Sequence, residues 1–167
     1  EYPDMLPAFD RNLPPLPVRA ASARGAAADA RAEDLPEWNL ADLYADMDAP
    51  ELARVLDRVA ADAITFESEW KGRLEDAARA PASGDLGRAL RAYEAIEELM
   101  GRIGSYAGLL YAGDTANPVH AKFYGDVQQK LTDASAHILF FTLELNRIDD
   151  GLIDAALDAD PVFGRYR

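Results

Sequence analysis

The segment GRIGSYAGLLYAGDTANP, residues 101–118, decides the fold because it holds the end of one helix and the start of the next. Gly113 is a helix-stop residue, whereas Asn117 followed by Pro118 pairs an N-cap with a proline in the first helical turn. The short connection between these two signals predicts a pair of antiparallel neighbouring helices.

Small residues recur along one stripe of the helix that precedes this stop. They are Gly101, Gly104, Ser105, Gly108 and Ala112. Each glycine inside a helix costs about 1 kcal/mol relative to alanine. We therefore expect a neighbouring helix to approach the backbone closely along this stripe.

Apolar residues spaced three and four positions apart predict three long helices. The first is expected from an N-cap at Asp48 to about Ala80, where Pro81 follows. The second is expected from about residue 83 or 85 to Ala112. The third starts at Pro118, and its apolar stripe reaches residue 148.

No strand pattern of period two appears, so the predicted fold class is all-α. We expect an elongated antiparallel bundle of three long helices plus short C-terminal helices, one over about 152–159 and another starting at Asp160. Residues 1–34 contain five prolines within the first seventeen positions and are interpreted as an irregular Pro/Ala-rich leader. The helical domain is expected over 35–167, and Asn39 is expected to cap a short turn near its start.

Composition excludes several classes of function. Hydrophobic residues make up 49% of the 167 residues, which is too many for a disordered acidic chain. The formal net charge of −13 argues against binding nucleic acid or an anionic membrane surface, both of which need a basic protein surface. We find neither an apolar run long enough to span a membrane nor a secretory signal, so a cytoplasmic protein is expected.

Residues suited to metal binding or nucleophilic catalysis are sparse. The chain has no cysteine, and its two histidines, His120 and His137, lie far apart in the sequence. Neither forms the His-Glu-x-x-His pair that a helix-borne zinc site requires. Glu144 lies in a dense apolar stretch, where a charge is usually paired, and Arg102 is its expected partner.

The apolar pattern widens in the second half of the third helix. Leu139, Phe140 and Leu143 point away from its main apolar stripe. A helix that is apolar on nearly every side is buried on nearly every side. We therefore expect further polypeptide to cover Phe140 and Leu143.

Three segments of the chain resemble the N-terminal helical region of oligoendopeptidase F, a branch of the thimet-oligopeptidase-like zinc metallopeptidases. The segments are WNLADLY at 38–44, GRIGSYAGLLYAGDTANP at 101–118 and HILFFTLELNRIDD at 137–150. They occur in matching order, and the resemblance covers roughly residues 35–167. It implies that the chain is a truncated piece of such a peptidase.

The resemblance also implies what the parent protein does. Family members are cytoplasmic zinc metalloendopeptidases that hydrolyse short peptides inside a channel. Their zinc and its His-Glu-x-x-His site belong to a missing C-terminal catalytic domain, so this chain should hold no catalytic, cofactor-binding or metal residue and should be inactive alone. The matched region forms a wall of the channel and restricts oligopeptide substrates by size. Candidate channel-lining or domain-interface residues are Tyr106, Tyr111, Leu139, Phe140 and Leu143.

A second hypothesis comes from another class of protein. The chain would then be a stand-alone acidic helical interaction or scaffold protein. It would form a homodimer, or bind a partner helix, through the exposed apolar face around Phe140.

Overall fold

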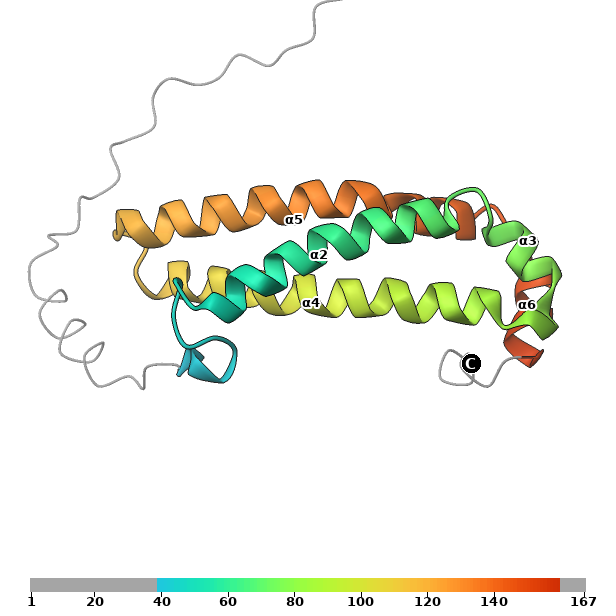
Figure 1. Ribbon diagram of the computed structural model, residues 1–167, viewed down its shortest axis with the longest axis horizontal. Coiled ribbons are helices and arrows are strands. Elements are labelled where there is room, and N and C mark those ends of the chain that lie inside the picture. The colour runs from blue at the N-terminus through green and yellow to red at the C-terminus, as the bar shows by residue number, and fades with distance from the viewer. Residues whose placement is uncertain (1–38, 160–167) are drawn as a thin grey trace, which may run out of the picture. The chain divides into compact units, whose positions relative to one another are not determined.

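The computed structural model describes residues 39–159, in which every regular element is a helix and no strand occurs (Figure 1). This confirms the all-α prediction. The leader expected over 1–34 and the helix start expected at Asp160 lie outside the described residues. The elements are η1 (Leu40–Asp42), α2 (Pro50–Trp70), α3 (Leu74–Arg79), η2 (Pro81–Ser83), α4 (Asp85–Gly113), α5 (Pro118–Leu145) and α6 (Asp150–Ala159). None of these helices combines the length and the apolar character needed to cross a membrane.

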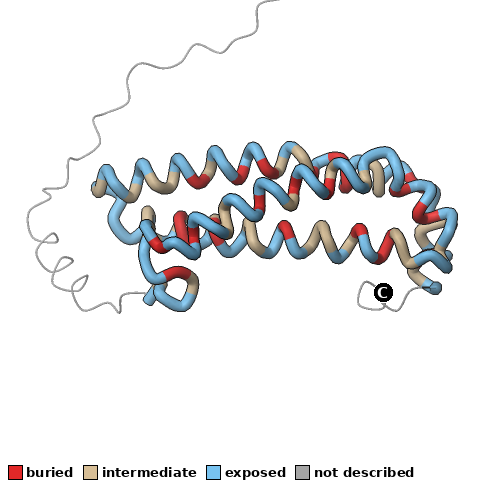
Figure 2. The backbone as a smooth tube through the Cα atoms, viewed as in Figure 1, coloured by how far each residue is buried: buried red, intermediate tan, exposed pale blue. Residues whose placement is uncertain are grey.

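Helices α2, α4 and α5 lie side by side, and the chain reverses direction between α2 and α4 and again between α4 and α5 (Figure 1). Each of the three packs against the other two. Buried positions recur along their facing sides, as Figure 2 shows. The largest fully buried side chains are Phe141, Leu52, Leu74, Ile103, Ile138, Val59 and Val127. Among the described residues, no polar or charged residue is buried.

Side-chain caps start two of the described helical elements, η1 and α5. The Asn117 side chain accepts hydrogen bonds from the backbone N–H groups of Val119, at 2.9 Å, and His120, at 3.4 Å, which confirms it as the N-cap of α5. Asn39 caps η1 in the same way, accepting from Ala41 N–H at 3.0 Å. The predicted cap at Asp48 is wrong: the N-cap of α2 is Ala49, which makes no side-chain cap, and Pro50 occupies the first turn.

The single helix predicted over 48–80 is wrong as well, because α2 ends at Trp70 and α3 starts at Leu74. Gly72 lies between them with φ +76°, a left-handed conformation that glycine adopts without strain. Its N–H donates to both carboxylate oxygens of Glu144 on α5, at 2.8 and 3.0 Å. A partner distant in sequence therefore stabilises the break.

The glycine stripe on α4 does not bring two backbones together, which corrects the prediction of close approach. A Cβ added at Gly101 would find nothing within 4 Å. At Gly104 it would meet Leu131 Cδ1 at 3.4 Å, and at Gly108 it would meet Tyr124 Cε2 at 3.9 Å. Side chains of α5, not its backbone, fill the space beside the stripe.

Candidate interaction site on the outer face of α5

Two leucines in the second half of α5 face away from the core. Leu139 is 57% exposed and Leu143 is 50% exposed. They lie four residues apart, so they share one face of the helix. A pair of large apolar side chains on one face favours contact with another surface, whereas a single exposed leucine would need no explanation.

Phe140 is not part of this exposed face, and the expectation that further polypeptide covers it is wrong. The residue is 8% exposed, and its ring centroid lies 5.4 Å from that of Phe66 on α2. Phe66 also contacts Phe141, at 5.7 Å between centroids, and Tyr93 of α4 stacks on Phe141 at 4.4 Å. An aromatic cluster from three helices therefore encloses Phe140 with the chain's own side chains.

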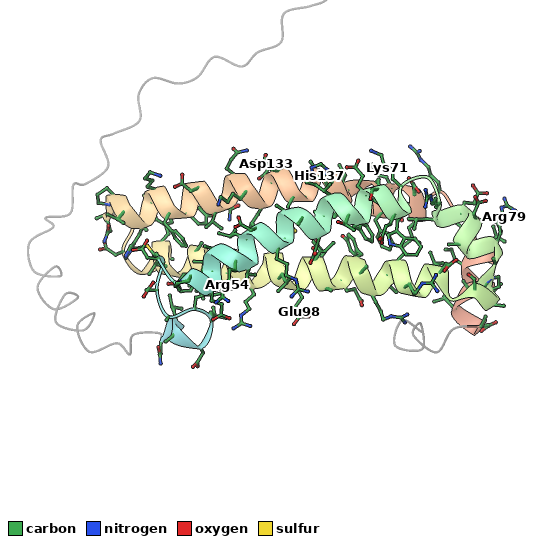
Figure 3. The ribbon with its side chains drawn as sticks, viewed as in Figure 1. Arg54, Lys71, Arg79, Glu98, Asp133 and His137 are labelled. Carbon is green, nitrogen blue, oxygen red and sulfur yellow. The ribbon has the colours of Figure 1, made fainter. Side chains whose placement is uncertain are left out.

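A polar junction links α2 to α5 at His137, two residues before Leu139 in the sequence. Glu67 of α2 contacts His137 Nδ1 at 2.5 Å and accepts from Lys71 Nζ at 2.5 Å. Figure 3 labels His137 and Lys71 along this edge of the bundle. The hydrogen bond from His137, followed by that from Lys71, lowers the pKa of the Glu67 carboxyl below its ordinary value. His137 is thus half-buried and hydrogen-bonded, as an ordinary helix residue can be.

The predicted ion pair between Arg102 and Glu144 is also wrong. Glu144 bonds to Gly72, as described above, whereas Arg102 Nη2 donates to the carbonyl oxygen of Leu43 at 3.0 Å. The guanidinium carbon of Arg102 lies 5.3 Å from the centroid of the Tyr44 ring. Arg102 therefore holds the segment after η1 against α4.

The two candidate tyrosines differ in their surroundings. Tyr106 is 3% exposed and packs edge to face against Tyr44 at 5.3 Å, so it is a core residue. Burial raises the pKa of Tyr106 above its ordinary value of 10.0. Tyr111 is half-buried and stacks on Tyr124 of α5, with 5.2 Å between ring centroids. Of the five predicted interface residues, the structure leaves Leu139 and Leu143 most open to contact.

Two cavities lie at the N-terminal end of α4, and the sequence pattern did not predict them. The first, of about 320 Å³, is lined by apolar residues of α4, α5 and α6: Leu86, Leu90, Phe141, Leu145, Ile153, Ala156 and Leu157. The second, of about 520 Å³, is lined by charged residues around Trp70. The first depends on where α6 packs and the second on where α3 packs, and the periodicity of single helices reveals neither.

Metal-binding groups are not assembled within 39–159: no set of three or more His, Cys, Asp or Glu side chains there is placed to hold an ion. His120 Nδ1 is buried without a hydrogen-bond partner among the same residues.

No protein-family model, no curated protein and no solved structure matches this chain.

Proposed function

We propose that this chain is the N-terminal, non-catalytic helical domain of an oligoendopeptidase F-like zinc metallopeptidase of the cytoplasm. Its three long helices would form one elongated antiparallel bundle, closed by the short C-terminal helices. The bundle would be a wall of the substrate channel that limits oligopeptide substrates by size. Zinc and the catalytic residues would come from the C-terminal domain.

The exposed pair Leu139 and Leu143 carries this proposal. Both lie within HILFFTLELNRIDD, one of the three segments that resemble the family. Their exposure leaves an apolar face in that segment, as a surface between two domains would need. Burial of each leucine against another domain would contribute about 1–2 kcal/mol, because roughly half of each side chain is still accessible.

Reading the gene downstream of the codon for Arg167 is the most direct test. The proposal expects several hundred further codons that include His-Glu-x-x-His. The product of that gene should bind zinc and cleave a quenched fluorescent peptide, and Leu139→Glu with Leu143→Glu should lower its activity and thermal stability. A stop codon close after the codon for Arg167 would refute the proposal.

A matched control uses Leu109→Glu and Val119→Glu, since both residues are exposed and neither lies in the segment 137–150 that holds Leu139 and Leu143. The control pair should leave activity unchanged. Equal losses in the two double variants would show a general effect of surface charge and contradict the assigned interface.

The enclosure of Phe140 favours the second candidate, a stand-alone acidic helical interaction protein. Phe66 covers Phe140 from within the chain, so this part of the core needs no second domain. On this hypothesis the gene ends soon after the codon for Arg167. Light scattering of the chain alone would then show a homodimer, or light scattering of a mixture would show a complex with a partner helix. Leu139→Glu should dissociate either assembly.

A further inference from the structure

The cavity between α4, α5 and α6 is apolar throughout its lining. It forms because α6 packs on α3 and η2, which leaves a hollow between α6 and the adjoining ends of α4 and α5. Its volume of about 320 Å³ is at the lower end of the range for ligand sites in proteins. With no polar group to orient a polar ligand, it suits one or two bulky aliphatic side chains.

The helix that borders this cavity is acidic. Asp150, Asp154 and Asp158 are spaced four residues apart, so they follow one face of α6, and α6 contains no lysine or arginine. Ile153 and Leu157, which line the cavity, each directly precede one of these aspartates. Neither Asp150 nor Asp154, both exposed, forms an ion pair with another residue of 39–159. Within residues 39–159, the carboxylates of Asp150 and Asp154 therefore lie beside an apolar hollow without an ion-pair partner.

We propose that this cavity is a docking site for a basic amphipathic helix of another protein. A leucine or a similar side chain of the partner enters the cavity between Leu90 and Ile153, while its lysines or arginines face Asp150 and Asp154. A second copy that docks through its own α6 is a poor occupant of this cavity, because α6 carries three aspartates and no lysine or arginine, so two such helices would repel each other here. The proposal concerns α6 and holds whether or not the chain belongs to a peptidase.

Fluorescence anisotropy with the complete 167-residue chain tests the proposal. The probe is a fluorescein-labelled 15-residue helix of leucine and lysine with its leucines on one face. A leucine–glutamate helix of the same pattern and a leucine–lysine peptide of scrambled order are the comparison peptides. The patterned leucine–lysine helix should bind saturably, and both comparison peptides should bind at least about tenfold more weakly.

Substitutions distinguish binding in the cavity from attraction of the probe to the general negative charge of the protein. Ile153→Glu should weaken binding by more than about tenfold, because it places a carboxylate beside the entering side chain, and Ile153→Ala should weaken it about threefold. Asp154→Lys should weaken binding about fivefold. Leu109→Glu and Glu98→Lys are the matched controls, since both residues are exposed and neither lines the cavity. Each control should change affinity less than about twofold, with helicity by circular dichroism unchanged throughout.

Four results would overturn the proposal. Unchanged probe binding by both Ile153 variants would show that the probe does not enter the cavity. If Asp154→Lys and Glu98→Lys weaken probe binding equally, the binding depends on the net charge of the protein and not on the carboxylates beside the cavity. A homodimer that Ile153→Glu dissociates, seen by light scattering, would make a second copy the occupant. Tighter probe binding after deletion of residues 160–167 would show that the chain covers its own cavity.

Discussion

Replacing Glu144 by alanine tests how the bundle is joined at the break between α2 and α3. The Gly72 N–H donates to both carboxylate oxygens of Glu144, at 2.8 and 3.0 Å, across 72 positions of sequence. A hydrogen bond to a charged group contributes about 1.5–3 kcal/mol. Because Gly72 is exposed and Glu144 half-buried, water can replace part of this bond. We expect Glu144→Ala to lower the free energy of unfolding by about 1–2 kcal/mol.

Urea unfolding followed by far-ultraviolet circular dichroism measures this loss. Glu144→Gln keeps a neutral oxygen acceptor and should lose about half as much. Glu98→Ala, on an exposed position of α4, is the control and should change the stability by less than about 0.5 kcal/mol. If Glu144→Ala matches the control, the bond to Gly72 does not stabilise the fold.

A double-mutant cycle distinguishes this contact from the ion pair that the sequence suggested. Arg102 bonds to the carbonyl oxygen of Leu43 and not to Glu144, so the effects of Arg102→Ala and Glu144→Ala should add. A coupling energy above about 0.5 kcal/mol would show that Arg102 and Glu144 interact, which would contradict their separate contacts with Leu43 and Gly72.

Three further predictions concern α4, the aromatic cluster and the polar junction. Gly101→Ala should raise the free energy of unfolding by about 0.5–1 kcal/mol in urea, since an added Cβ meets nothing within 4 Å; destabilisation would restore the idea of close helix approach. Phe66→Ala should lower the free energy of unfolding by about 3–5 kcal/mol, because Phe66 is 2% exposed and contacts three other rings. A loss under about 1 kcal/mol would contradict that packing. His137→Ala should raise the pKa of the Glu67 carboxyl, measured by carbon-13 NMR titration, and an unchanged pKa would exclude their hydrogen bond. Because folding lowers the pKa of the Glu67 carboxyl, its ionised form stabilises the native state at pH values above its ordinary pKa of 4.5. This stabilisation is lost as the pH falls through the lowered pKa of the folded state.

Helix type and most helix ends follow from the sequence, because they depend on residues close together in the chain. Asn117 caps α5 with its own side chain, Pro118 begins the helix, and α4 ends at Gly113. The apolar spacing along α2 likewise predicts that Leu52, Val59 and Phe66 are buried. These interactions are local, so their signals can be read one helix at a time.

Tertiary structure alone decided the features that join distant segments. The break at Gly72 depends on Glu144 of α5, and the enclosure of Phe140 depends on Phe66 of α2. The apolar cavity exists only because α6 packs on α3 and η2. Periodicity shows which face of a helix is apolar but not which neighbour covers it, and that choice is made when the whole bundle packs.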